Sequence, residues 1–138
     1  MESIRHWLRW RPVNTLLALG AIIALGAWLR LYGTTANGFR MCDEGYYFVP
    51  ARLMAIVNHA EPVLYFYHGT IVWVYWGCRL FGFSPESALL WAALNGIACL
   101  PLIWLFSRLL FSSRIALLAA LAAATNYFLV YYSRINLS

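Results

Sequence analysis

"NTLLALGAIIALGAWLRLY" fills residues 14–32, and Arg30 is its one charged residue. An α-helix needs about 20 consecutive apolar residues to cross the hydrocarbon core of a bilayer. Backbone groups in lipid must pair internally, and the chain shows no alternating pattern of a closed barrel, so this run predicts a membrane helix. Of the whole chain, 63% is hydrophobic and 11% is charged, against roughly a quarter charged in a soluble domain. The composition therefore excludes an ordinary water-soluble bundle.

Three further apolar segments follow the first one. They lie at residues 69–83, 87–111 and 115–132. The expected fold is therefore an all-α integral membrane protein with about four transmembrane helices. Between the second and third segments, LFGFSPES predicts a tight turn, with Ser84 as the N-cap and Pro85 at the first helical position.

The arginines before the first segment indicate its orientation. Residues 1–13 carry Arg5, Arg9 and Arg11, and the positive-inside rule places such an end in the cytoplasm. The chain is then a multi-pass protein of the plasma membrane, and residues 33–68 form an external loop with short amphipathic helices. A cleaved signal peptide is the alternative for the N-terminus, but the apolar run ends without a small-residue cleavage site.

The remaining composition excludes other classes of function. All ten basic residues are arginine, and they stand at the ends of apolar runs, where a guanidinium can reach the lipid interface. They form no basic face, so the net charge of +5 does not indicate binding to nucleic acid. Cys42, Cys78 and Cys99 have no CxxC spacing, so neither a zinc site nor a disulfide is predicted.

Most of the polar chemistry lies in the external loop, around MCDEGYYFVP at residues 41–50. Asp43 and Glu44 stand together there, near the membrane surface. A carboxylate in this place can act as general base on an acceptor hydroxyl, or it could hold a divalent cation that neutralises phosphate. The alternative is structural, an N-cap and a first-turn acid that favour a helix dipole. A short helix is expected to start at Pro50.

Two further stretches contain candidate ligands. In LYFYHGTIVWVYW, Tyr67, His68 and Gly69 stand where the chain re-enters the membrane. His68 could donate to a phosphate or a sugar, and Gly69 would permit close backbone approach, whereas an ordinary interfacial aromatic belt is the alternative. In YYSRINLS, Arg134 follows a tyrosine pair at a helix end. A guanidinium suits bidentate contact with phosphate or carboxylate, although arginine is also common at membrane boundaries.

The order of these motifs resembles the N-terminal region of the GT-C membrane glycosyltransferases of the dolichyl-phosphate-mannose protein mannosyltransferase type. The aminoarabinose transferases that modify lipid A are among the relatives, and the YHG form looks most like the archaeal and bacterial branch linked to protein glycosylation. The resemblance implies transfer of a sugar from a polyprenyl-phosphate donor to a protein or lipid acceptor, with inversion at the anomeric carbon. It points to no certain cofactor, and the need for a divalent cation stays open.

The resemblance also implies roles for single residues. Asp43 matches the acid that serves as base on the acceptor, and Glu44 matches its supporting neighbour. His68 matches the histidine of an H-P-P or H-G-P motif beside the donor. Tyr67 and Gly69 would belong to the same substrate-binding subsite.

The chain departs from the family pattern at two points. Thr70 stands where the family has proline, which puts the local turn in doubt. Arg134 matches an arginine that precedes a second acidic residue, but no acid follows it before Ser138. Residues 133–138 are therefore expected to be a truncated motif, and the chain the N-terminal portion of a longer enzyme.

One conflict concerns the side of the membrane. If all four segments cross once, Arg134 faces the cytoplasm while Asp43 lies outside, and Arg108 and Arg114 flank an external turn against the positive-inside rule. Either one segment does not cross fully, or the role of Arg134 is wrong.

Two other functions fit the same sequence. A small four-helix transporter agrees in size, but transporters normally place an essential acid inside a span. A non-catalytic membrane subunit would use the small-residue face ALLAALAAA, at residues 116–124, as its interface with a larger partner.

Overall fold

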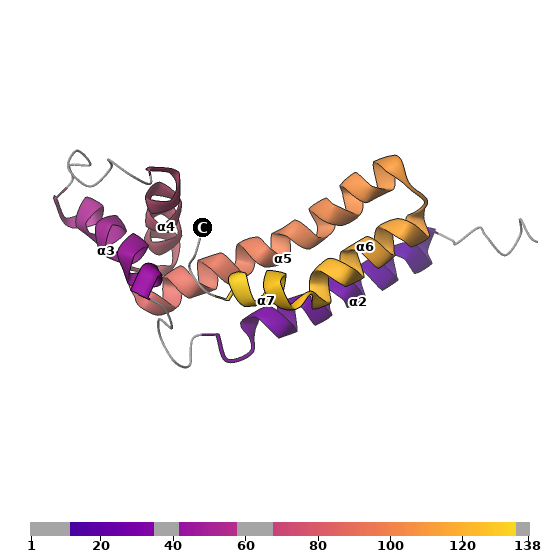
Figure 1. Cartoon of the computed structure of the whole chain (residues 1–138), viewed down its shortest axis with the longest axis horizontal. Coiled ribbons are helices and arrows are strands. Elements are labelled where there is room, and N and C mark those ends of the chain that lie inside the picture. The colour runs from indigo at the N-terminus through magenta and orange to yellow at the C-terminus, as the bar shows by residue number, and fades with distance from the viewer. Residues whose placement is uncertain (1–11, 35–41, 58–67, 135–138) are drawn as a thin grey trace, which may run out of the picture.

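The computed structural model describes residues 12–34, 42–57 and 68–134, and every regular element in these ranges is an α-helix (Figure 1). This confirms the all-α membrane class expected from the sequence. In chain order the helices are α2 (Pro12–Leu31), α3 (Cys42–Val57), α4 (His68–Phe81), α5 (Pro85–Leu110), α6 (Ser113–Thr125) and α7 (Tyr127–Tyr132).

Helices α2, α5 and α6 pack together along the long axis of the molecule (Figure 1). Small residues let them approach closely: the Cα of Gly26 on α2 faces Leu100 of α5 and Ala124 of α6, with no room for a larger side chain. In the alanine-rich segment predicted as an interface with a partner, Ala116, Ala120, Ala123 and Ala124 are buried within this chain, whereas Leu118, Leu121 and Ala122 are exposed. The buried residues between the three helices are Leu19, Leu100, Leu117, Ala120, Ala123 and Ala124.

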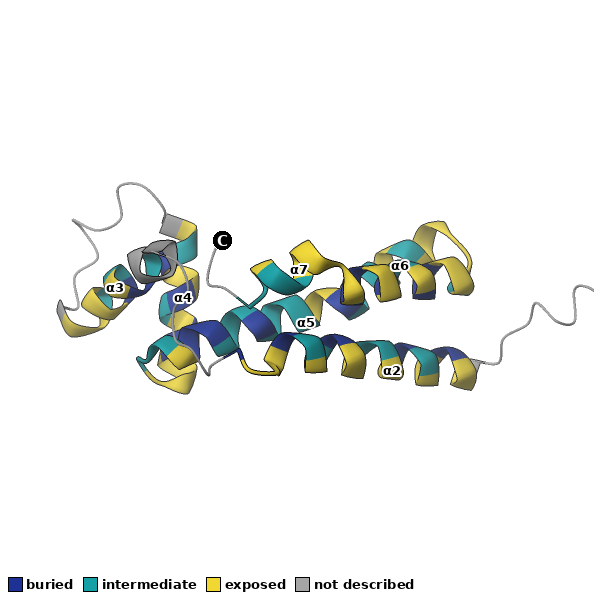
Figure 2. Ribbon diagram, turned by 60° about the horizontal axis from the view of Figure 1, so that its bottom comes forward, coloured by how far each residue is buried: buried dark blue, intermediate teal, exposed yellow. Residues whose placement is uncertain are grey.

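Two of these helices are long and apolar enough to cross a membrane, over Val13–Leu31 and Pro85–Leu110. Only 22% of the first apolar window and 17% of the second is buried inside the fold. Figure 2 shows exposed residues along the length of α2. The core helix of a soluble protein would bury most of such a surface, so both helices suit contact with lipid.

The segment expected as one helix over residues 115–132 is two helices in the structure. Helix α6 ends at Thr125, and Asn126 has an extended backbone with ψ of 123°. The Asn126 side chain then caps α7 by accepting a hydrogen bond from the Leu129 N–H at 3.1 Å. Asparagine is among the preferred N-cap residues, so the break has a local cause that hydropathy does not report.

The turn between α4 and α5 agrees with its prediction. Ser84 is the N-cap of α5, and its hydroxyl accepts a hydrogen bond from the Ser87 N–H at 3.2 Å. Pro85 opens the helix, and Gly82 has φ of +98°, a conformation that glycine adopts without strain. LFGFSPES therefore encodes its turn locally.

Helices α3 and α4 form a separate pair at one end of the long bundle (Figure 1). Phe48 and Ala51 of α3 are buried against Ile71, Val74 and Cys78 of α4. The prediction that α3 starts at Pro50 was wrong, because the helix begins eight residues earlier and Pro50 lies inside it. Burial of Phe48 and Ala51 on either side of this proline holds a helix that local preference would break.

Candidate functional site

The acidic pair lies at the start of α3. Because α3 begins at Cys42, the backbone places Asp43 and Glu44 in its first turn, where a carboxylate favours the helix dipole. The side chains of both acids are outside the described residues. Their catalytic role stays a prediction, and the position also fits the structural alternative.

The predicted donor subsite lies at the start of α4. His68 is the first residue of this helix, and its side chain is outside the described residues, as is the whole of Tyr67. Gly69 is exposed, and nothing stands within 4 Å of the place a Cβ would take there. Figure 1 shows α3 and α4 running antiparallel. The first turn of α3 and that of α4 are thus at opposite ends of the pair, and this backbone arrangement does not bring the acids and His68 together.

Arg134 lies beside the end of α2. Its Nη2 donates a hydrogen bond to the carbonyl oxygen of Tyr32 at 2.8 Å, and its backbone N–H donates to Tyr131. Tyr32 directly follows α2, so residues 102 positions apart meet here. No partner for Nη1 of Arg134 occurs among the described residues, which leaves donors that can take a ligand.

Aromatic rings surround this end of the bundle. Trp28 and Tyr32 of the α2 end have ring centroids 5.6 Å apart, and Tyr127 and Tyr131 of α7 stack at 5.9 Å. Tyrosine and tryptophan gather where a membrane protein passes from hydrocarbon to headgroups. The rings on both elements indicate that the end of α2 and the end of α7 that carries Tyr131 lie at one interfacial level.

Arg30 is a residue that the motif analysis missed. It stands in the last turn of α2 and is only 2% exposed. Its Nη1 donates to the carbonyl oxygens of Gly26 at 3.2 Å and Ala124 at 3.1 Å, and its Nη2 donates to that of Ala123 at 3.1 Å. One guanidinium therefore satisfies two carbonyls in the last turn of α6 and also bonds the Gly26 carbonyl one turn earlier in its own helix. The helix dipole of α6 favours positive charge at that end.

The signal for Arg30 was present in the sequence. A charged side chain inside an apolar run is costly in lipid, so such residues face the protein interior and have named partners. The run at residues 14–32 contains one such residue, Arg30. Only the fold identifies the partners, because the carbonyls of Ala123 and Ala124 are more than 90 residues away.

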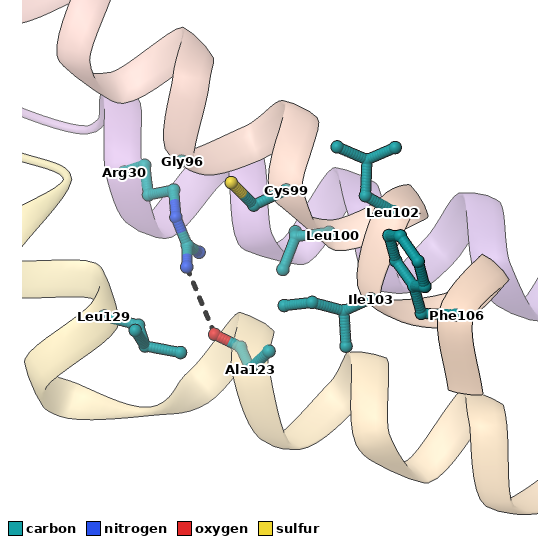
Figure 3. Close-up of a pocket in the computed structure, with 9 residues that line it drawn as sticks. All are labelled: Arg30, Gly96, Cys99, Leu100, Leu102, Ile103, Phe106, Ala123 and Leu129. Atoms are coloured by element: carbon teal, nitrogen blue, oxygen red, sulfur yellow. Dashed lines mark hydrogen bonds between the residues drawn. The ribbon is translucent and has the colours of Figure 1, made fainter.

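An apolar cavity of ≈ 380 Å³ opens beside Arg30 (Figure 3). It lies between α2, α5, α6 and α7, and Figure 3 shows the Arg30 side chain crossing one end of it toward the Ala123 carbonyl. The Nε atom of Arg30 is buried without a hydrogen-bond partner. The lining residues are Arg30, Gly96, Cys99, Leu100, Leu102, Ile103, Phe106, Ala123 and Leu129.

No metal site is evident in the part of the chain that the structure describes. Within it, no three histidine, cysteine, aspartate or glutamate residues gather as ligands. Asp43 and Glu44, the acids that could hold a divalent cation, have side chains outside that part.

Comparison with known proteins gives one family. The family described as dolichyl-phosphate-mannose-protein mannosyltransferase matches residues 61–138, which is more than half of the chain. The matched part contains α4 to α7, the arginine at 134 and the predicted donor subsite. Searches of curated proteins and of solved structures gave no match.

Proposed function

The chain belongs to the dolichyl-phosphate-mannose-protein mannosyltransferase family, and from that premise we propose the reaction that its residues serve. The family is one of membrane glycosyltransferases. The proposed reaction moves a sugar from a polyprenyl-phosphate donor to a hydroxyl of a protein or lipid, at the extracytoplasmic face of the plasma membrane. Asp43, Glu44, Tyr67, His68, Gly69 and Arg134 are its proposed site residues.

The hydrogen bond from Arg134 to Tyr32 is the observation that carries this proposal. If α2 crosses the membrane, Tyr32 emerges on the side where the loop to Asp43 begins. Arg134 then lies on the same side as Asp43, as the proposed mechanism requires. The sequence conflict disappears if α4 stays at this surface, which its 14 residues favour, since a crossing takes about 20.

The proposed roles follow from the charges that develop during transfer. The acceptor oxygen attacks the anomeric carbon while the bond from that carbon to the phosphate oxygen breaks. Asp43 takes the proton of the acceptor hydroxyl, and Glu44 supports it. The leaving phosphate stays on the lipid as an anion, which the guanidinium of Arg134 stabilises. His68, with Tyr67 and Gly69, would contact a part of the donor away from the bond that breaks, because the first turn of α4 lies at the opposite end of the helix pair from that of α3.

Replacement of the proposed base tests the reaction. We expect Asp43→Asn in the full-length protein to abolish transfer of labelled mannose from dolichyl-phosphate-mannose to membrane proteins or lipids, because an amide cannot accept the proton. General base catalysis is worth roughly 10²–10⁴ in rate. Membranes from cells that express each variant at equal level would be assayed.

Glu86→Gln is the matched control. Glu86 is an exposed acid in the first turn of α5, and it has no proposed part in the reaction. This variant should transfer at the parent rate. Parental activity of Asp43→Asn, with Glu86→Gln also active, would remove Asp43 from the mechanism.

A further inference from the structure

Hydrogen bonds from Arg30 connect the end of α2 to the end of α6, next to the break between α6 and α7. Two of its three hydrogen bonds reach the carbonyls of Ala123 and Ala124, in the last turn of α6. Asn126 follows two residues after Ala124 and redirects the chain into α7. Arg30 therefore fixes the end of α6, and the direction of α7 depends on the position of that end.

Gly96 of α5 makes room for this arrangement. A Cβ at position 96 would collide with the Cβ of Ser133, and it would stand 3.0 Å from the Ser133 Oγ and 3.1 Å from the Arg30 Nε. Arg30, Gly96 and Ser133 therefore pack at one point. Ser133 is the residue directly before Arg134, so whatever moves Ser133 moves the start of the arginine side chain.

Arg134 makes a second link between these two parts of the chain, from the residues after α7 back to the end of α2. Arg134 reaches back to the carbonyl of Tyr32, two residues after Arg30. Arg134 thus bonds a carbonyl two residues after Arg30, and Arg30 bonds carbonyls of α6, the helix before the one that leads to Arg134. Neither guanidinium contacts a carboxylate among the described side chains, and the Nε atom of each is buried without a partner. Both links join the end of α2 to the segment from the end of α6 to Arg134, so we expect loss of the Arg30 link to loosen the Arg134 link.

We propose that Arg30 is a positioning residue, which fixes the break between α6 and α7 so that the Arg134 guanidinium is presented at the end of α2. The inference rests on the proposed role of Arg134 in binding the donor phosphate. Arg30 does not touch the donor in this account. The planar guanidinium of Arg30 directs its N–H groups at two successive carbonyls, whereas a lysine ammonium has no such geometry. Arg30→Lys should therefore not restore the position of Arg134.

Binding of a lipid phosphate tests this inference. The full-length protein in phosphatidylcholine nanodiscs would be titrated with dolichyl phosphate, and native mass spectrometry would give the bound fraction. Arg134→Gln should weaken binding about tenfold, the loss expected for one charged hydrogen bond. Arg30→Gln and Arg30→Lys should weaken it to a similar degree. The double variant Arg30→Gln/Arg134→Gln should bind no more weakly than Arg134→Gln, since both changes remove the same contact.

The outcomes separate this inference from the proposed function. Parental binding by Arg30→Gln, with weak binding by Arg134→Gln, overturns the positioning role alone. Losses that multiply in the double variant also overturn it, because Arg30 would then act independently of Arg134. Parental binding by Arg134→Gln overturns the proposed phosphate role of Arg134, and the inference falls with it.

Gly96→Ala tests the same point without removing a buried charge, in case Arg30→Gln cannot be purified as a monodisperse protein. Its methyl group would push Ser133 and the Arg30 guanidinium away from α5, and we expect binding to fall as in Arg134→Gln. Gly20→Ala is the matched control, because nothing stands within 4 Å of a Cβ at position 20. Equal binding by the two glycine variants would overturn the inference.

Discussion

Gly77 shows how one residue sets the distance between two helices. A Cβ added there would collide with the indole ring of Trp91 and stand 2.8 Å from the Trp91 Cβ. Trp91 is also fixed by ring contacts, with centroid distances of 5.1 Å to Trp73 and 6.1 Å to Phe81. The indole therefore cannot move away without disturbing its neighbours.

Gly77→Ala should lower the free energy of unfolding. Forcing a methyl group into a packed site costs typically 1–3 kcal/mol, which exceeds the roughly 0.5–1 kcal/mol that alanine gains over glycine in a helix. Thermal unfolding in detergent would measure the difference. Gly20→Ala, in open space on α2, should be neutral or stabilising. A Gly77→Ala protein as stable as Gly20→Ala would contradict the packing described for α4 and α5.

Single residues were predictable where their reason is local. Ser84 and Pro85 are a cap and a first helical residue because of their own chemistry, and the structure has them in those roles. The importance of Arg30 depends on carbonyls from a distant helix, so the sequence could mark it only as an unusual charge. Asp43, Glu44 and His68 stay predictions, because their side chains are outside the described residues.

At the scale of elements, two helix starts in this chain differ in one hydrogen bond. The Ser84 hydroxyl caps α5, whereas Ser112 stands at the N-cap of α6 and makes no side-chain cap bond. Ser84→Ala should therefore cost about 1 kcal/mol of stability, the usual worth of a serine cap. Ser112→Ala should cost nearly nothing. Unfolding measurements on both variants would check this, and equal losses would show that the Ser84 bond is not stabilising.

The apolar segments were predicted better than their ends and interruptions. Hydropathy located the regions of α2, α4 and α5 because lipid and core both select apolar residues. It could not locate the break at Asn126, since one polar residue hardly changes the average of a long window. It also failed at Pro50, where packing of Phe48 and Ala51 on α4 outweighs the local preference of proline.

At the scale of the whole molecule, the arrangement of the helices bears on the side of the membrane on which Arg108 and Arg114 lie. Figure 1 shows the turn between α5 and α6 at the same end of the bundle as the start of α2, and the α3–α4 pair at the other end. Arg108 and Arg114 flank that turn, so they lie at the end where Arg5, Arg9 and Arg11 precede α2 in the sequence. With α4 at the outer surface, Arg108 and Arg114 lie on the cytoplasmic side, together with the arginines before α2, so they no longer flank an external turn.

We therefore expect three crossings, by α2, α5 and the α6–α7 pair. Residue 112 distinguishes this arrangement from four crossings, because the first places it in the cytoplasm and the second outside. A Ser112→Cys variant, with Cys42, Cys78 and Cys99 replaced by serine or alanine, would be treated in intact cells with a membrane-impermeant maleimide. Three crossings predict no labelling until the membrane is permeabilised.

Glu2→Cys in the same background is the control for the cytoplasmic side, and Ser84→Cys should react from outside because α5 would begin there. Labelling of residue 112 in intact cells would mean that α4 crosses after all. Arg134 would then face the cytoplasm, and its contact with Tyr32 would not exist in the membrane.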